Sequence, residues 1–331
     1  MNAERVAPSD LVAALVSAKQ PIVVGHVNPD ADALGAMLAL AWALPAADAA
    51  IALADAPISG KLLFMLDIAD VVPRAHPSLL ETADVVVVVD TASAKRINVT
   101  GGWPAVADKT VVNIDHHITN TDFGAFNWVV DNASSTSELV YRLVRQMDWP
   151  MTAGMATLLY AGIYADTCGF SLPTVTGETM DVAAALVRIG ADVGVVGDKL
   201  VRSHRRHDFD LVRTVYANTN TAVNDQVAYS TLSHAEIIAA GCNAEDIDDQ
   251  VSIPRSLSGV RIAVLFSEGE PGVIRVNLRG EGGTVVLPLA EKLGGGGHQF
   301  SAGVRIRGTI EDAVKKVLAE AENLLGASKS P

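Results

Sequence analysis

Aspartates and histidines recur in the first half of the chain at the places where apolar segments end. The stretch "VVGHVNPDADALGA" puts one histidine and two aspartates directly after an apolar run. Carboxylates brought together would repel one another and raise each other's pKa values, and bound cations remove that repulsion. Imidazole mixed with carboxylate, without thiolate, suits manganese, iron, cobalt or zinc. The pattern therefore predicts a site for divalent metal ions built from His26, Asp30, Asp32, Asp90, Asp115, His116, His117 and Asp166.

The elements that must position these residues are alternating strands and helices. Strand-like runs are "PIVVG", "AAIALAD", "DVVVVVD" and "KTVVNID", and continuous valine runs suit parallel strands that are buried on both faces. The carboxyl ends of such strands meet at one crevice of an open sheet. His26, Asp30 and Asp32 follow the first run, and Asp90 ends the third. We expect an α/β fold with a doubly wound, mainly parallel sheet that brings these side chains together.

Helices are expected between and after these strands. One should run from Asp32 to Leu44, and another should begin near Ser135, because Glu138 three residues later completes a capping-box pattern. Further helices are expected in "AGMATLLYAGIYADT", which carries Asp166, and in "GETMDVAAALVRIGAD".

The composition changes at "DKLVRSHRRHDFD", residues 198–210, which are dense in basic residues and histidine. We interpret this change as a domain connection and expect domains at residues 1–197 and 223–331, with a linker at 198–222. The second domain should contain the strand "QVAYSTL", the hairpin "GVRIAVLFSEGEPGVIRVNLRG", the loop "GGGGH" and a final amphipathic helix. These elements predict a smaller mixed α/β domain, with a cleft between the two domains.

Composition excludes several classes of protein. The formal net charge of −13 disfavours broad adhesion to nucleic acid or anionic membranes. The longest uncharged stretch, residues 33–47, is too short for the roughly 20 apolar residues of a membrane span. The first residues show no apolar export signal, so we expect a cytoplasmic protein. Cys168 and Cys242 match no CxxC pattern, which argues against a thiolate zinc site.

Five short segments resemble the DHH phosphoesterase family, named for its Asp-His-His triplet. "GHVNPDADALGA", "VVVVDTA", "NIDHHITN" and "GIYADT" are similar to its four sequential motifs, and "GGGGHQFSAG" resembles the glycine-rich motif of its DHHA1 domain. The commoner family pattern has glycine where this chain has Ala31, and a methyl group there leaves the ligands untouched. The resemblance covers nearly the whole chain.

The resemblance implies two divalent metal ions, manganese first, with magnesium or cobalt as alternatives. One ion would be held by His26, Asp30 and Asp90. The other would be held by Asp32, Asp90, His116 and Asp166. A hydroxide that bridges two ions is a strong nucleophile near neutral pH, so hydrolysis by in-line attack at phosphorus is expected.

The same resemblance assigns roles to the remaining residues of the Asp-His-His triplet. Asp115 looks like a residue that orients the loop, and His117 looks like a group that faces the scissile phosphate. The expected catalytic residues are therefore His117, Asp115 and Asp90.

The second domain is expected to bind substrate through its glycine-rich loop and one strand. Consecutive glycines let backbone amides approach an anion closely, and alternating residues of "VIRVNLRG" share one face of a strand. The expected substrate-binding residues are Arg275, Asn277, Arg279, Gly295, Gly296, Gly297 and His298. Which arginine contacts the substrate stays open.

Short substrates fit this organisation better than long polymers. Only 5% of the residues are aromatic, and a channel for single-stranded polymer would want stacking aromatics, which argues against the large RecJ-type exonucleases. The chain resembles the nano-RNase and pAp phosphatase group. That resemblance implies hydrolysis of short RNA oligonucleotides such as pApA to 5′-mononucleotides, and of pAp (3′-phosphoadenosine 5′-phosphate) to AMP and phosphate. Cyclic di-AMP is a further candidate substrate, and a homodimer is expected from the family.

Two alternatives remain. A manganese-dependent inorganic pyrophosphatase shares the DHH half, but the basic Ser-Arg-Lys-Lys motif of its second domain is absent here. A catalytically silent nucleotide-binding regulator should have lost one or more metal ligands, and this sequence retains all six positions. The sequence does not rank pApA, pAp, other short RNAs and cyclic di-AMP against one another.

Overall fold

The chain divides into two compact units, residues 1–203 and 204–331. A computed structural model describes residues 6–45, 50–52, 58–69, 77–202, 206–242, 247–297 and 299–327. The boundary falls inside the predicted linker at 198–222, but most of that segment is regular structure. It includes the end of α8 (Val193–Leu200), all of α9 (Arg206–Ala217) and β6 (Thr219–Ala222). The basic composition of the segment does not reveal the apolar stripe of α9, where Leu211 and Val215 are buried.

The first unit is built on a five-stranded sheet in the order β2-β1-β3-β4-β5. All neighbouring strands pair in parallel, as the valine runs predict. The strand order reverses between β1 and β3, and in such sheets ligands bind beyond the carboxyl ends of the strands at the point of reversal. The strands are β1 (Pro21–Val24), β2 (Ala50–Ala52), β3 (Val85–Val89), β4 (Thr110–Asp115) and β5 (Phe126–Val129).

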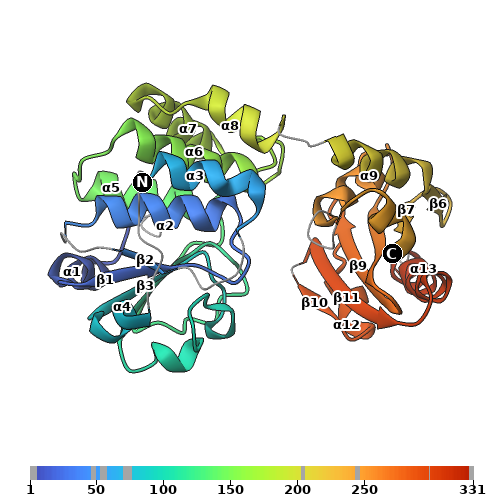
Figure 1. The fold of residues 1–331 in the computed structure, drawn as a ribbon, viewed down its shortest axis with the longest axis horizontal. Helices are drawn as coiled ribbons and strands as arrows, with labels where there is room; N and C mark the ends of the chain where they lie inside the picture. The colour runs from blue at the N-terminus through green and yellow to red at the C-terminus, as the bar shows by residue number, and fades with distance from the viewer. Residues whose placement is uncertain are drawn as a thin grey trace. The chain divides into compact units, whose positions relative to one another are not determined.

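Helices cover both faces of this sheet, so the doubly wound fold is confirmed. All five valines of β3 are buried, with Val85, Val87 and Val89 in the core on one face and Val86 and Val88 in the core on the other. Figure 1 shows the helices α2, α3, α5, α6, α7 and α8 on one side of the sheet and α4 on the other. The helices of this unit, besides α8, are α1 (Ser9–Ser17), α2 (Ala31–Ala43), α3 (Leu63–Ile68), α4 (Pro77–Thr82), α5 (Thr136–Gln146), α6 (Ala153–Asp166) and α7 (Gly177–Ile189).

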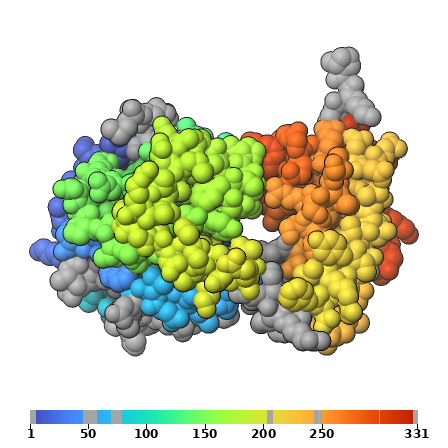
Figure 2. Space-filling model, turned by 90° about the horizontal axis from the view of Figure 1, so that it is seen from above, coloured from blue at the N-terminus to red at the C-terminus, as the bar shows by residue number. Residues whose placement is uncertain are grey.

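The buried helices α2 and α6 pack closely enough to require glycine at the contact. A Cβ atom on Gly35 of α2 would lie 2.5 Å from the backbone oxygen of Leu158 in α6. Outside this layer, α7 and α8 form part of the surface of the unit (Figure 2). The close contact fixes α2 against α6, which matters because both helices carry predicted metal ligands.

The second unit contains a mixed six-stranded sheet in the order β10-β11-β9-β8-β7-β6. Among its described strands, only β7 and β8 pair in parallel. The predicted hairpin is β8 and β9, joined through a turn in which Gly272 has a positive φ of 75°. The described strands besides β6 are β7 (Val227–Leu232), β8 (Ile262–Glu270), β9 (Val273–Gly280), β10 (Gly296–Gly297) and β11 (Ser301–Arg307). The smaller mixed α/β domain is thus confirmed.

Helices flank this second sheet as well. Val264 and Phe266 of β8 belong to the core beneath α13, whereas Leu265 belongs to the core beneath α9 and α10. The described helices besides α9 are α10 (His234–Ala239), α11 (Ser252–Arg255), α12 (Leu287–Lys292) and α13 (Ile310–Ala327). Among the residues that the structure describes, no helix combines the length and apolarity that a bilayer crossing needs.

The start of α5 confirms half of the predicted capping box. The Ser135 side chain accepts a hydrogen bond from the Glu138 amide, as expected for an N-cap. The Glu138 carboxylate does not return to Ser135. It is fully buried, and it accepts bonds from Ser134, Arg142 and Thr179 instead. Burial raises the pKa of Glu138, but the bonds from Ser134 and Arg142 outweigh burial and hold the pKa below its ordinary value of 4.5.

Replacing Glu138 by glutamine should therefore lower the free energy of unfolding by about 2 kcal/mol at pH 7, because charge-assisted bonds are lost. A depressed pKa in the folded state means that this stabilisation is fully present above about pH 4.5 and is lost as the pH falls through the folded-state pKa. Urea unfolding of the wild type and Glu138→Gln at pH 7 and at pH 4 measures the effect. The matched control is Glu178→Gln, since Glu178 is exposed and should matter little. A difference that does not shrink at the lower pH would contradict the assignment.

Candidate active site

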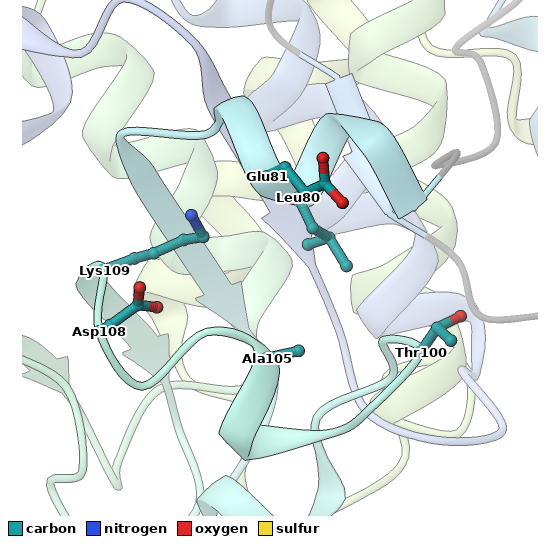
Figure 3. Close-up of a pocket in the computed structure, with 6 residues that line it drawn as sticks. All are labelled: Leu80, Glu81, Thr100, Ala105, Asp108 and Lys109. Carbon is teal, nitrogen blue, oxygen red and sulfur yellow. The ribbon is translucent and has the colours of Figure 1, made fainter.

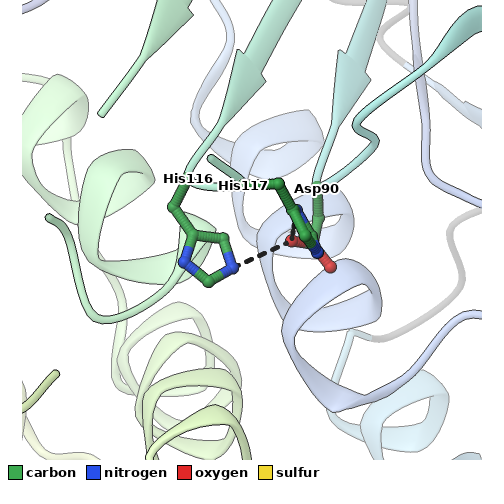
Figure 4. Close-up of side chains that lie close together, drawn as sticks. All are labelled: Asp90, His116 and His117. Atoms are coloured by element: carbon green, nitrogen blue, oxygen red, sulfur yellow. Dashed lines mark ion pairs between the residues drawn. The ribbon is translucent and has the colours of Figure 1, made fainter. Parts of the chain in front are cut away.

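The eight predicted site residues converge at the carboxyl ends of the strands in the first unit. His26 follows β1, Asp90 follows β3, and the triplet Asp115, His116 and His117 lies at the end of β4. Asp166 is the last residue of α6. Figure 4 shows Asp90, His116 and His117 reaching toward one another from neighbouring strands. The sheet therefore brings together residues that lie up to 140 positions apart in the sequence.

One group of potential ligands consists of His26, Asp30 and Asp90. His26 Nε2 lies 3.8 Å from Asp30 Oδ2 and 3.5 Å from Asp90 Oδ2. His26 Nδ1 lies 2.8 Å from the carbonyl oxygen of Val27, and because a carbonyl only accepts, Nδ1 donates. The Nε2 atom is thereby directed at the carboxylates, which is the arrangement found in histidine ligands of metals.

The two oxygens of the Asp30 carboxylate have different partners. Its Oδ1 accepts bonds of 3.0 Å from the amides of Asp32 and Ala33, so Asp30 is the N-cap of α2. Its Oδ2 faces His26 instead. The side chain of Asp30 is 60% exposed whereas that of Asp90 is 3% exposed. A helix cap and a ligand position are thus compatible in one carboxylate, because each role uses a different oxygen.

The second group of potential ligands consists of Asp32, His116 and Asp166. Their ligand atoms lie within 4.8 Å of one another. His116 Nε2 is 3.4 Å from Asp166 Oδ2 and 3.6 Å from Asp90 Oδ1. Asp90 therefore turns Oδ2 toward the first group and Oδ1 toward the second, which is the geometry that a carboxylate shared by two ions requires.

The N-terminus of α5 holds Asp32 and Asp90 in place. The amides of Thr136 and Ser137 donate to the two oxygens of Asp32 at 2.7 and 2.9 Å. The Thr136 hydroxyl donates to Asp90 Oδ1 at 3.0 Å. Space for these contacts depends on Gly162, because a Cβ there would lie 2.1 Å from Ser137 Oγ and 2.8 Å from Asp32 Oδ1.

The backbone at Asp90 is unusual. Its φ is +51°, in the left-handed region that aspartate and asparagine tolerate better than most residues. Asp90 is also almost fully buried. A strained backbone beside a buried carboxylate is maintained only when the surrounding structure fixes it, and such positions cluster at functional sites.

Without a cation, the charges in this cluster are poorly balanced. Burial, the charge of Asp90 and the charge of Asp166 raise the pKa of Asp32 well above its ordinary value. Burial raises the pKa of Asp166 to about 7. Burial lowers the pKa of His26 and of His116, but the neighbouring carboxylates outweigh it and raise these values to about 10 and about 9. The donor set therefore suits cations, whose charge would take the place of these protons.

His117, Asp90 and His116 form a third group of potential ligands, but His117 also has a close contact with Asp115. Its Nδ1 lies 2.7 Å from Asp115 Oδ1, and Asn120 donates to the other oxygen of Asp115 at 2.6 Å. Burial raises the pKa of Asp115, but the bond to His117 outweighs burial and lowers it. An ionised carboxylate only accepts, so His117 Nδ1 donates and is not available as a ligand. The remaining ring nitrogen, Nε2, is the one that could contact a substrate.

The substrate-binding residues predicted in the second unit share one region of its sheet. Arg275, Asn277 and Arg279 alternate along β9, and the backbone register places them opposite Arg305, Gly303 and Ser301 of β11. Gly296 and Gly297 are not a free loop, because as β10 they pair with β11. A Cβ on Gly295 would lie 2.2 Å from the backbone oxygen of Gly303, which explains glycine there. His298 lies outside the described residues.

Figure 3 shows a pocket on the first unit. It is lined by Leu80, Glu81, Thr100, Ala105, Asp108 and Lys109. Leu80 and Glu81 precede β3, and Asp108 and Lys109 precede β4, so these residues lie toward the amino ends of the strands. The cluster of potential metal ligands lies at the opposite, carboxyl ends of the strands.

Sequence reasoning did not single out three residues that support the site. The sequence marks Thr136 and Ser137 only as the start of a helix, and it places Asn120 in a motif without indicating a role. The sequence signal for Asn120 is its place in the "NIDHHITN" segment. For Thr136 and Ser137 no local signal exists, because their partner Asp32 lies more than 100 residues earlier in the chain.

Comparisons with known proteins agree with this geometry. Residues 20–163 match the N-terminal domain of the DHH family, and residues 224–327 match the DHHA1 domain. The chain is 32% identical over 316 residues to the bifunctional oligoribonuclease and PAP phosphatase NrnA of Thermus thermophilus, covering 93% of this chain and 91% of the relative. It is 29% identical to the cyclic-di-AMP phosphodiesterase GdpP of Geobacillus thermodenitrificans, although it spans only 46% of that relative.

Structural similarity extends over the whole chain. An exopolyphosphatase-related protein from Bacteroides fragilis matches with a TM-score of 0.88 and 26% sequence identity, covering 98% of both chains. The ordered motifs, the parallel sheet with its cluster of aspartates and histidines, and the matches over both units lead to one assignment. The chain belongs to the DHH family and joins a DHH domain to a DHHA1 domain.

Proposed function

We propose that this protein is a metal-dependent phosphoesterase that hydrolyses short oligoribonucleotides such as pApA to 5′-mononucleotides and pAp to AMP and phosphate. The observation that carries the proposal is the pair of ligand groups with Asp90 between them, one carboxylate oxygen turned toward each. Relatives named as bifunctional oligoribonuclease and PAP phosphatase, from Thermus thermophilus and Bacillus subtilis, support the choice of substrates. The GdpP relative keeps cyclic di-AMP as a further candidate.

The residues of the first unit would divide the chemistry between them. His26, Asp30 and Asp90 would hold one ion, and Asp32, Asp90, His116 and Asp166 the other. Bound divalent ions supply a hydroxide nucleophile near neutral pH and neutralise charge on the phosphoryl oxygens. His117, oriented by Asp115, would face the scissile phosphate and stabilise charge that develops during in-line displacement.

The second unit would recognise the rest of the substrate. The proposed contacts come from His298, the amides of Gly295, Gly296 and Gly297, and the side chains of Arg275, Asn277 and Arg279. Alternating basic residues on one strand face suit a nucleotide phosphate, because a guanidinium forms paired, charge-assisted bonds with phosphate oxygens. Manganese as the physiological metal, a homodimer and a cytoplasmic location remain predictions.

Product analysis tests this proposal directly. Metal-stripped protein, reloaded with manganese, is incubated with pApA, pAp, cyclic di-AMP and pyrophosphate in parallel. The expected result is metal-dependent release of AMP from pApA and pAp, with no activity before reloading. Phosphate from pyrophosphate alone would make the protein a pyrophosphatase instead. No product from any substrate would favour a nucleotide-binding regulator.

A further inference from the structure

An arginine lies at the edge of the cluster of potential metal ligands, on the segment that follows β3. Arg96 is the last residue of the 3-10 helix η3 (Ala94–Arg96), and its side chain is exposed. Its carbonyl oxygen accepts a bond of 2.8 Å from the Val27 amide, and Ile97 pairs with His26 in an isolated β-bridge. The backbone of Arg96 is thereby fixed against the loop that carries His26.

The guanidinium of Arg96 has an unusual environment. Its Nη2 lies 3.5 Å from His26 Nδ1. His26 Nδ1 already donates to the Val27 carbonyl, so this contact brings two donors together and is not a stabilising hydrogen bond. Within the described part of the chain, Arg96 forms no ion pair, although several carboxylates lie in the adjacent cluster. An exposed cation held at this place without a protein acceptor is available to an anionic ligand.

Phosphate matches this position. A guanidinium forms paired, charge-assisted bonds with phosphate oxygens, and its charge does not titrate near neutral pH. Arg96 lies on the Nδ1 side of the His26 ring, and the carboxylates of Asp30 and Asp90 lie on its Nε2 side. A phosphoryl group bound at the first ligand group would therefore lie within reach of a long, exposed arginine side chain. The site otherwise presents mainly carboxylates and imidazoles, which offer a phosphate little attraction by themselves.

We infer that Arg96 binds the phosphoryl group that is hydrolysed and donates hydrogen bonds to its oxygens from the His26 side of the site. The inference rests on the proposed function, since it deepens the account of the same site. Arg96 would act on the scissile phosphate, whereas the second unit would contact the remainder of the nucleotide. Loss of Arg96 should weaken the binding of the transition state and of phosphate, while metal binding stays intact.

The test compares Arg96→Gln with Lys95→Gln, which removes the neighbouring exposed cation on the same 3-10 helix. Both variants are assayed on pApA and on ApA, which shares the scissile diester but lacks the 5′-phosphate. Arg96→Gln should lower kcat/KM about 10- to 100-fold on both substrates, and by the same factor. Arg96→Lys should recover part of the loss, because it restores the charge without the paired bonds. Lys95→Gln should behave as wild type.

Two further measurements separate binding from folding and from activity. Manganese content and the melting temperature should be unchanged in Arg96→Gln, and calorimetric binding of inorganic phosphate to the manganese-loaded protein should weaken about 10-fold or more. A loss confined to pApA would place Arg96 on the terminal phosphate and overturn the inference. Unchanged kinetics in Arg96→Gln would also overturn the inference. A loss of bound manganese in this variant would overturn it too, because Arg96 would then act by positioning His26.

The outcome for Arg96 can be distinguished from failure of the proposed function. If wild-type protein hydrolyses neither dinucleotide, the proposed function fails, yet phosphate binding still tests the arginine. Weaker phosphate binding in Arg96→Gln than in Lys95→Gln would then support a phosphate contact. Equal binding in the two variants would overturn it.

Discussion

Replacing Asp90 by asparagine should lower kcat/KM for pApA by about 10³-fold or more, the largest effect expected from any single substitution in this protein. Asp90 turns one oxygen toward His26 and the other toward His116, so it is the carboxylate placed to serve both ligand groups. A neutral amide in its place would weaken both groups at once. Metal analysis of the purified variant should show a loss of bound manganese together with the loss of turnover.

Asparagine is the informative replacement at this position because of the backbone. Asp90 has a φ of +51°, and asparagine adopts this left-handed conformation nearly as well as aspartate, whereas alanine would add strain. The Asp90→Asn variant should therefore fold normally, which circular dichroism and the melting temperature can check.

Asp122→Asn provides the matched control. Asp122 has a φ of +48° in the same unit, but it is exposed and lies outside the ligand groups. Wild-type turnover is expected for this control. Wild-type turnover in a folded Asp90→Asn variant would instead refute a shared carboxylate and, with it, the proposed two-ion site.

The sequence was sufficient to predict which residues meet, because it marks where strands end. A valine run followed by aspartate, as at Asp90, identifies the carboxyl end of a buried parallel strand, and parallel sheets bring such ends to one edge. The same logic placed His26 and the Asp-His-His triplet correctly. It did not reveal β5, whose residues "FNWV" form neither a continuous apolar run nor a clear alternation.

Details set by distant parts of the chain could not be predicted. The orientation of Asp32 depends on amides at the start of α5, and the space for it depends on Gly162 in α6. The position of Arg96 depends on pairing between the segment after β3 and the segment after β1. These contacts follow from strand order and helix packing, which local propensity does not encode. The basic segment at 198–210 contains the boundary between the two units, but its composition does not reveal the apolar stripe of α9.

His117 and His116 are adjacent in sequence, but their surroundings assign them different roles. His116 Nε2 faces Asp90 and Asp166, as a ligand would. His117 is bonded through Nδ1 to Asp115, and Asn120 holds Asp115 from the other side. The three residues His117, Asp115 and Asn120 form a network that fixes one imidazole tautomer. An imidazole held in this way can stabilise charge on a phosphoryl oxygen or a leaving group without binding metal.

Substitution His117→Gln should therefore lower kcat for pApA about 10²-fold while manganese content stays at the wild-type level. His116→Gln, the matched variant one residue earlier, should lose metal as well as activity. Asp115→Asn should reproduce part of the His117 effect. The amide would hold the His117 ring less firmly, and the negative charge of Asp115 beside the ring would be lost. Steady-state kinetics combined with metal analysis separates these cases. If His117→Gln also lost metal, His117 would have to be a ligand, in the group that it forms with Asp90 and His116, and the role assigned here to the Asp115 bond would be wrong.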